Sequence, residues 1–131
     1  EYTDKIERFS IDECFFFFFF FLKGRKLIDI ANEISKRVKK ELGFTVNIGV
    51  APNKLLAKMA SDFQKPDRVH TLYKEEIETK MWKLPISELF MLGRKSVPKL
   101  YNLGIRTIGD LAKYDKNLLI KLLMSLIHKV I

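Results

Sequence analysis

The sequence has few residues that bind metals through sulfur or imidazole. It contains one cysteine, Cys14, and two histidines, His70 and His128, which lie far apart in the chain. A single cysteine excludes an internal disulfide framework and is typical of a reducing compartment. Structural zinc is not expected because cysteine and histidine do not cluster, and neither histidine has a recognisable catalytic partner.

Long apolar segments are also missing. The apolar run of residues 15–22 is far shorter than the roughly 20 residues that a membrane helix needs. Residues 1–4 do not form the basic segment that opens a secretory signal. We therefore expect a soluble, cytoplasmic protein with no membrane partner. The run contains seven consecutive phenylalanines, residues 15–21, which in a strand would place aromatic rings on both faces of a sheet.

Composition and charge predict a small folded protein that binds a polyanion. The chain has 131 residues, of which 47% are hydrophobic, enough for the core of one modest domain or two very small ones. The net charge is +8, and residues 91–131 contain eight Lys or Arg against two Asp or Glu. A basic segment of this kind is typical of contact with nucleic acid or an anionic membrane surface.

Two adjacent carboxylates, Asp12 and Glu13, lie between two segments of strand character. Residues 5–11 alternate polar and apolar, with Ile6, Phe9 and Ile11 available for a core, and residues 15–22 are apolar throughout. A turn between the two strands would place both carboxylates at a sheet rim. Oxygen ligands of this kind suit Mg²⁺, which clamps the reacting oxygens in phosphoryl transfer. Acidic residues also favour solvent-exposed turns without any such role.

The following residues predict alternating helices and strands. Residues 24–42 have the apolar spacing of an amphipathic helix ended by Gly43, and residues 44–50 alternate as a strand. A second helix begins after Pro52-Asn53 and is closed by residues 65–67. Its predicted buried stripe comprises Leu55, Leu56, Met59, Ala60 and Phe63.

A strand at residues 69–73 and a short helix at 74–82 follow. This order predicts an α+β fold over residues 1–83, with a mostly antiparallel sheet and two helices on one face.

Residues 84–131 are predicted to be a separate, all-helical domain. Leu103-Gly104-Ile105 joins two short helices, and Thr107 is the N-cap of the second. Such a glycine turn offers backbone N–H groups to a phosphate. An ordinary helical hairpin with a glycine cap has the same pattern.

Several motifs together resemble those of the Y-family translesion DNA polymerases of the DinB/UmuC type, the ImpB/MucB/SamB family. They are Ser10-Ile11-Asp12-Glu13, Val46-Asn47-Ile48-Gly49-Val50, residues 51–66 with the sequence APNKLLAKMASDFQKP, Leu84-Pro85-Ile86, and residues 103–111 with the sequence LGIRTIGDL. They occur in the family's order and cover most of residues 5–112.

The resemblance implies a partial palm followed by a helix-hairpin-helix thumb. Asp12 and Glu13 match the catalytic carboxylates that hold Mg²⁺ for attack of a primer 3′-hydroxyl on the α-phosphate of a dNTP. Lys65 matches the lysine that contacts the incoming triphosphate, and Ser10 is given a supporting role. The residues expected to contact the DNA backbone are Gly93, Arg94, Lys95, Lys99, Gly104 and Arg106. The partners implied are primer-template DNA, dNTP and, through regions outside this chain, the sliding clamp.

This sequence departs from the family in three respects. The family's first metal-binding Asp and its fingers precede the matched region, and a further DNA-gripping domain follows it, so we expect the isolated chain not to extend primers. Phe17 stands where the family usually has an acidic residue, and Met91 where the thumb usually has its first glycine. Residues beyond about 116 do not match.

Two other functions fit parts of the pattern. A non-catalytic helix-hairpin-helix module would bind DNA in a salt-dependent manner without metal-dependent nucleotide binding. A nucleotide cyclase-like palm enzyme would use the same carboxylates and would give residues 84–112 no role in gripping DNA.

Overall fold

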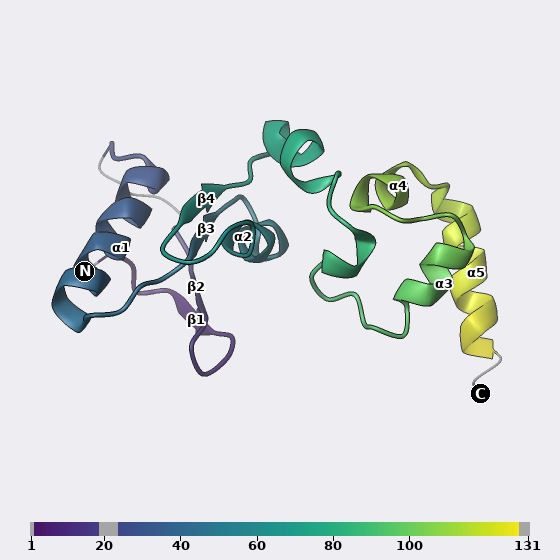
Figure 1. Ribbon diagram of the computed structural model, residues 1–131, viewed down its shortest axis with the longest axis horizontal. Coiled ribbons are helices and arrows are strands. Elements are labelled where there is room, and N and C mark those ends of the chain that lie inside the picture. The colour runs from purple at the N-terminus through teal and green to yellow at the C-terminus, as the bar shows by residue number, and fades with distance from the viewer. Residues whose placement is uncertain (1, 19–23, 129–131) are drawn as a thin grey trace. The chain divides into compact units, whose positions relative to one another are not determined.

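The structure, a computed structural model, describes residues 2–18 and 24–128, with side chains up to residue 122 (Figure 1). The chain divides into two compact units, Glu1–Glu75 and Glu76–Ile131. We predicted a boundary at residue 84, and the assignment of palm to residues 1–83 and thumb to residues 84–131 remains a prediction. Within the described residues no helix is long and apolar enough to cross a membrane.

The first unit begins with a β-hairpin. Strands β1 (Ile6–Arg8) and β2 (Cys14–Phe16) pair antiparallel, with Ile6 opposite Phe16 and Arg8 opposite Cys14. The predicted turn between them is confirmed. The predicted core role of the first strand is wrong, because Ile6, Phe9 and Ile11 are all exposed. Residues 19–21 of the phenylalanine run lie outside the described residues.

A βαβ segment packed against a longer helix forms the rest of the first unit. Helix α1 (Leu27–Leu42) ends at Gly43, whose φ of 76° is the left-handed cap that the sequence predicts. Strand β3 (Ile48–Val50), helix α2 (Lys54–Ser61) and strand β4 (Val69–Thr71) follow. The Asn53 side chain caps α2 by accepting a bond from the Leu56 amide.

The buried apolar residues in the described part of this unit come from both helices, from β3 and from the residue that follows β4. They are Ile30, Ala31, Val50, Leu56, Met59, Ala60 and Leu72. Of the predicted α2 stripe, Leu56, Met59 and Ala60 are buried, whereas Leu55 is exposed. Helix α2 ends at Ser61, earlier than the proline at residue 66 led us to predict.

The predicted single, mostly antiparallel sheet is wrong in its connectivity, although the α+β class holds. The described strands form two separate pairs, antiparallel β1-β2 and parallel β3-β4. The physical reason lies in the connection between β3 and β4. Strands joined through a helix return in the same direction, and α2 is such a connection.

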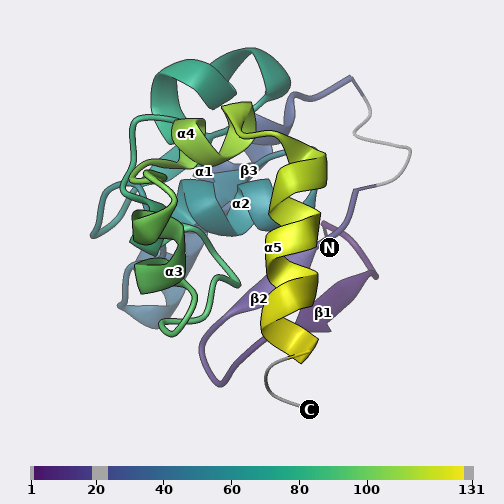
Figure 2. The same ribbon diagram turned by 90° about the vertical axis from the view of Figure 1, so that its right-hand side faces the viewer.

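The second unit is helical, as the sequence predicts. After a short 3₁₀ turn, η1 (Lys74–Glu76), it contains the π-helical turn η2 (Ile77–Met81) and the 3₁₀ turn η3 (Ile86–Glu88). Helices α3 (Val97–Asn102), α4 (Ile108–Lys113) and α5 (Lys116–His128) follow and are labelled in Figure 2. Among the side chains described in this unit, the buried apolar ones are Met81, Ile86, Leu100, Ile105 and Ile108.

The turn between α3 and α4 has the predicted glycine and cap. Gly104 has a φ of 79°, and the Thr107 hydroxyl accepts a bond from the Asp110 amide at 3.0 Å. The Asp110 carboxylate in return accepts bonds from the amides of Arg106 and Thr107 at 3.0 and 2.9 Å. This reciprocal capping box fixes the start of α4.

The capping box makes the stability of the second unit depend on pH. Bonds from the Arg106 and Thr107 amides hold the pKa of Asp110 below its usual value. Because the folded pKa lies below the unfolded one, this contribution is complete above the usual value of about 3.8 and is lost as pH falls through the folded pKa. We expect the urea midpoint, followed by fluorescence of Trp82, to be higher for the wild type than for Asp110→Asn at pH 7, and the difference to shrink by pH 2.5. A difference that stays constant with pH would contradict this.

Met91 occupies a backbone position that suits glycine. Its φ is 72° and its side chain is 81% exposed. The left-handed conformation costs a residue with a Cβ about 1–2 kcal/mol. Glycine makes the unfolded chain more flexible, which lowers the free energy of unfolding by about 0.5–1 kcal/mol. We therefore expect Met91→Gly to raise the free energy of unfolding by about 0.5–1 kcal/mol, measured by urea denaturation with Trp82 fluorescence. Met91→Ala keeps the Cβ, so an equal gain in that variant would contradict the explanation.

Candidate active site and nucleic-acid interface

Asp12 and Glu13 lie in the turn of the β1-β2 hairpin. The amides of Phe9 and Ser10 both donate to the Glu13 carbonyl oxygen, at 2.9 and 3.1 Å. These bonds close the turn and end the strand alternation that would otherwise send adjacent side chains to opposite faces.

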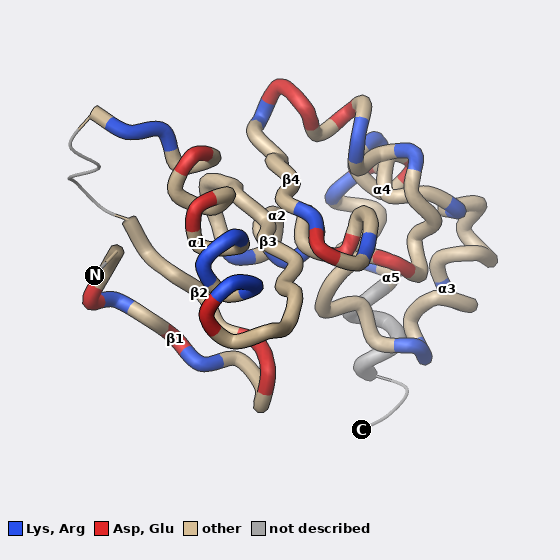
Figure 3. Tube along the Cα trace, turned by 60° about the vertical axis from the view of Figure 1, so that its left-hand side comes forward, with Lys and Arg blue, Asp and Glu red and all other residues tan. Residues whose placement is uncertain are grey.

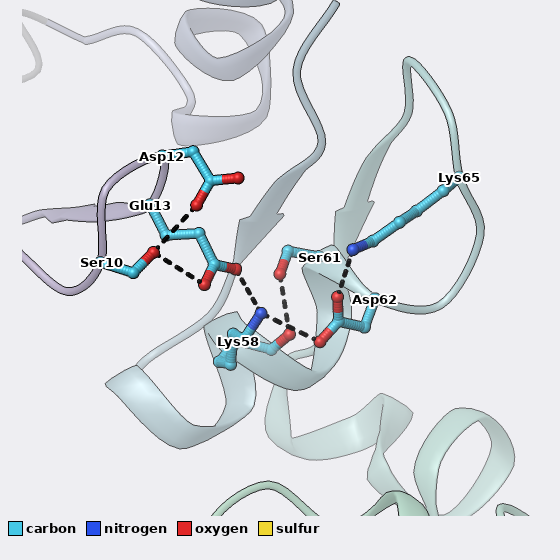
Figure 4. Close-up of polar contacts among 7 residues, drawn as sticks. All are labelled: Ser10, Asp12, Glu13, Lys58, Ser61, Asp62 and Lys65. Atoms are coloured by element: carbon cyan, nitrogen blue, oxygen red, sulfur yellow. Dashed lines mark hydrogen bonds and ion pairs between the residues drawn. The ribbon is translucent and has the colours of Figure 1, made fainter.

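The two carboxylates converge on one hydroxyl. Ser10 Oγ lies 3.0 Å from Asp12 Oδ1 and 3.3 Å from Glu13 Oε2 (Figure 4). Because a hydroxyl donates a single proton, the two carboxylates share this donor. Ser10 therefore holds an oxygen of each carboxylate near one point, which fits the supporting role that the resemblance implies for it.

The other oxygen of Glu13 forms an ion pair with Lys58 of helix α2. Lys58 Nζ also lies 3.1 Å from Asp62 Oδ2, and Asp62 Oδ1 pairs with Lys65 Nζ at 2.8 Å. Figure 4 shows these four side chains in a row of alternating charge that runs from the hairpin turn across the end of α2. The Lys58 side chain is only 14% exposed, so this ion pair is shielded from solvent more than an ordinary surface pair is.

Burial and charge act in opposite directions on these groups. Burial lowers the pKa of Lys58, but hydrogen bonds to Glu13 and Asp62 outweigh it and hold that pKa above its usual value. Burial likewise raises the pKa of Asp62, but the ammonium groups of Lys65 and Lys58 outweigh it and hold that pKa below its usual value. Both groups are therefore charged at neutral pH.

Sequence reasoning missed the role of Lys58 and Asp62. Both lie outside the apolar stripe predicted for the second helix, on the polar face where charged residues are ordinary. The available signal was their spacing, because Lys58 and Asp62 lie four residues apart and Asp62 and Lys65 three apart. That spacing indicates ion pairs along the helix but says nothing of the hairpin that supplies Glu13.

The donor set of the turn fits a hard divalent cation but is incomplete. Carboxylate oxygens brought together by Ser10 are suitable ligands for Mg²⁺. In residues 2–18 and 24–128, no group of three or more acidic, histidine or cysteine side chains is placed to hold a metal ion. Further ligands would have to come from beyond the described residues, from substrate or from water.

The residues predicted to contact DNA are all exposed in the second unit: Gly93, Arg94, Lys95, Lys99, Gly104 and Arg106. Figure 3 shows Lys and Arg spaced along the Cα trace of this unit. The Arg106 guanidinium lies 5.7 Å from the centre of the Tyr101 ring, which leaves its charge at the surface.

The glycine turn does not present its amides as predicted. The amides of Gly104 and Ile105 donate to the carbonyls of Tyr101 and Leu100, both at 3.0 Å. The next amides are used by the capping box, so a phosphate at this turn would meet side chains rather than free N–H groups. By contrast, the amides of residues 93–95 have no acceptor within the described part of the chain.

Phe17, which stands where the family usually has an acidic residue, does not contribute a ligand. The Lys54 ammonium lies 5.6 Å from the centre of its ring and 5.8 Å from that of Phe15. Lys54 also pairs with Glu7 at 2.6 Å, so its ammonium is held over the hairpin strands.

Comparison with known proteins identifies relatives over most of the chain. The profile of the impB/mucB/samB family matches residues 1–62. DNA polymerase IV of Clostridium acetobutylicum is 54% identical over 118 residues, which cover 90% of this chain and 30% of that protein. DNA polymerase IV of Bacillus velezensis is 45% identical over 123 residues, covering 94% of this chain and 30% of that protein.

Solved structures agree with the sequence relatives. A DinB family error-prone DNA polymerase from Sulfolobus solfataricus matches with a TM-score of 0.77 and 32% identity, over 92% of this chain and 37% of that one. A Dbh ternary complex matches with a TM-score of 0.76, 32% identity and the same two coverages.

The fold and the relatives together define the class. The chain matches part of a DNA polymerase, over 92% of its own length and 37% of the solved chains. The family is that of the Y-family, DinB-type DNA polymerases, with which this chain shares both sequence and fold. The chain spans 30% of the length of the curated relatives named above.

Proposed function

We propose that this chain supplies the carboxylate turn and the thumb of a DNA-directed DNA polymerase of the error-prone translesion type. The observation that carries the proposal is the convergence of Asp12 and Glu13 on the Ser10 hydroxyl, within a chain that is 54% identical to a DNA polymerase IV. A solvent-exposed acidic turn has no need for such convergence, because neighbouring carboxylates repel one another.

The proposed mechanism assigns one task to each part of the site. Asp12 and Glu13 present oxygens to Mg²⁺, which when bound lowers the energy of charge developing at the reacting phosphate. The Lys65 side chain is 54% exposed and pairs with Asp62. Its ammonium binds the triphosphate of an incoming dNTP. Ser10 keeps the two carboxylates convergent while these charges assemble.

The second unit is proposed to bind the backbone of primer-template DNA. Its exposed Arg94, Lys95, Lys99 and Arg106 provide charge, and Gly93 lets the chain approach a phosphate closely because no side chain stands in the way. Gly104 is equally open, with nothing near the position of a Cβ. These contacts read no base, as suits an enzyme that must accept any template.

The proposed cellular location and the proposed clamp partner follow from the same family. We place the enzyme in the cytoplasm, which suits its single exposed cysteine, Cys14. Attachment to the sliding clamp is proposed for regions outside this chain.

Primer extension by a chimaera tests the proposal. The chimaera carries this chain in place of the matching segment of the Clostridium acetobutylicum DNA polymerase IV, so the relative supplies everything outside the matched 118 residues. We expect the chimaera to extend a primer with Mg²⁺ and dNTPs, and we expect the isolated chain not to extend it. A chimaera that binds DNA with the salt dependence of the relative but never extends a primer would contradict the polymerase proposal and favour a non-catalytic DNA-binding module.

A further inference from the structure

The Lys58 ammonium lies where a positive charge is not expected, beside a carboxylate that is proposed to bind a metal ion. Its ammonium pairs with Oε1 of Glu13, the residue proposed to bind Mg²⁺. A cation already bound to this oxygen competes with a divalent ion for the same charge. The competitor is well ordered, because its side chain is 14% exposed and is also bonded to Asp62.

Asp62, the C-cap residue of the same helix, offers the ammonium an alternative partner. The distance from Asp62 Oδ2 to Lys58 Nζ is 3.1 Å, and the two residues are four apart in sequence, about one helical turn. Lys65 holds the other oxygen of Asp62 at 2.8 Å, so this carboxylate is oriented before Lys58 moves. The Ser61 hydroxyl donates to the Lys58 carbonyl oxygen at 2.8 Å, so Ser61 bonds the backbone of Lys58.

We propose that Lys58 is a positioning residue that acts through Glu13 as an exchangeable counter-ion. Before the metal binds, Lys58 neutralises Glu13 and limits its repulsion with Asp12. As the divalent ion approaches, the ammonium shifts wholly to Asp62 and releases Glu13 Oε1. The proposal rests on the proposed function of Asp12 and Glu13 as metal ligands and adds a determinant of how tightly the ion is held.

The exchange predicts opposite effects of two substitutions in one ion-pair network. Lys58→Met removes the competing cation, so metal affinity rises. Asp62→Asn removes the alternative partner, so Lys58 stays on Glu13 and metal affinity falls. Local damage to the end of α2 would instead weaken metal binding in both variants, so the pair separates an exchange role from a structural one.

Titration of the isotope-labelled 131-residue chain with Mn²⁺ tests this directly. The readout is paramagnetic broadening of the backbone amide signals of residues 11–14, which detects weak binding at that turn and needs no enzymatic activity. We expect Lys58→Met to bind Mn²⁺ about tenfold more tightly than the wild type and Asp62→Asn about threefold more weakly. Lys58→Arg, which retains the charge, should remain within about threefold of the wild type.

Lys54→Met is the matched control. It removes the same charge from the same helix, but Lys54 pairs with Glu7 and is 47% exposed. We expect its Mn²⁺ affinity to lie within about twofold of the wild type. Equal affinities for Lys58→Met and Lys54→Met, or weaker binding by Lys58→Met, would overturn the exchange.

The outcomes also separate this inference from the proposed function. A chimaera that extends primers, together with a chain whose Mn²⁺ affinity is insensitive to Lys58→Met, overturns the exchange alone. A chimaera that does not extend primers, together with the expected shifts in Mn²⁺ affinity, contradicts the polymerase function and supports the exchange. No broadening of residues 11–14 in any variant would overturn the carboxylate metal site and the exchange together.

Discussion

Asp12→Ala is expected to lower kcat for primer extension by the chimaera by about 10³-fold or more, because stabilisation by a bound metal ion amounts to several kcal/mol. Glu13→Ala is expected to have an effect of similar size. Each substitution leaves Ser10 with one carboxylate in place of two, so the oxygens no longer converge. The measurement is single-turnover extension of a labelled primer at saturating Mg²⁺ and dNTP.

Affinity for DNA should not change with these substitutions, since the proposed DNA contacts lie in the second unit. Asp4→Ala is the matched control, because Asp4 is an exposed carboxylate in the same unit, before β1. It should retain kcat within about twofold, as surface substitutions usually do. Turnover by Asp12→Ala equal to that of Asp4→Ala would remove the carboxylate turn from the mechanism.

Gly49→Ala is expected to destabilise the first unit by more than about 3 kcal/mol. A Cβ at this position of β3 would lie 1.9 Å from the Ala57 carbonyl oxygen and 2.6 Å from the Ser61 amide nitrogen. Both contacts are with the backbone of α2, which cannot move aside as a flexible side chain would. The close approach of β3 and α2 therefore requires glycine.

Hydrogen exchange measures this effect within the first unit. The Leu72 amide donates to the Val50 carbonyl at 2.9 Å in the unit's core, so its protection reports opening of the β3-β4 pair. Protection should fall by more than about 100-fold in Gly49→Ala, the equivalent of about 3 kcal/mol. Gly93→Ala, at a position with open space around it, should leave protection unchanged. Equal protection in the two variants would mean that β3 and α2 are not packed as closely as described.

Local chemistry explains which elements were predictable from the sequence. The amphipathic spacing before Gly43 predicts α1 and its left-handed cap, and both are observed. Thr107 and the α3-α4 turn follow in the same way from capping rules. The position of Met91 is also informative, because the resemblance implies a glycine there and the structure gives Met91 a φ of 72°.

Features that depend on contacts between distant residues were not predictable. The parallel pairing of β3 with β4 depends on the path of α2, and the exposed first strand depends on what packs against it. The ion pair between Glu13 and Lys58 joins residues on separate elements. The glycine turn at Gly104 was predicted in shape, yet its amides bond inward, which requires knowledge of the carbonyls of α3.

Anomalous scattering from Mn²⁺ in crystals of the chimaera with primer-template DNA and a non-hydrolysable dNTP analogue tests the central claim most directly. We expect a peak bonded to one carboxylate oxygen each of Asp12 and Glu13, at the 2.0–2.2 Å or so of a metal–carboxylate bond. The analogue's phosphates should lie beside the same ion. A peak held by other residues, with Asp12 and Glu13 facing solvent, would contradict the account.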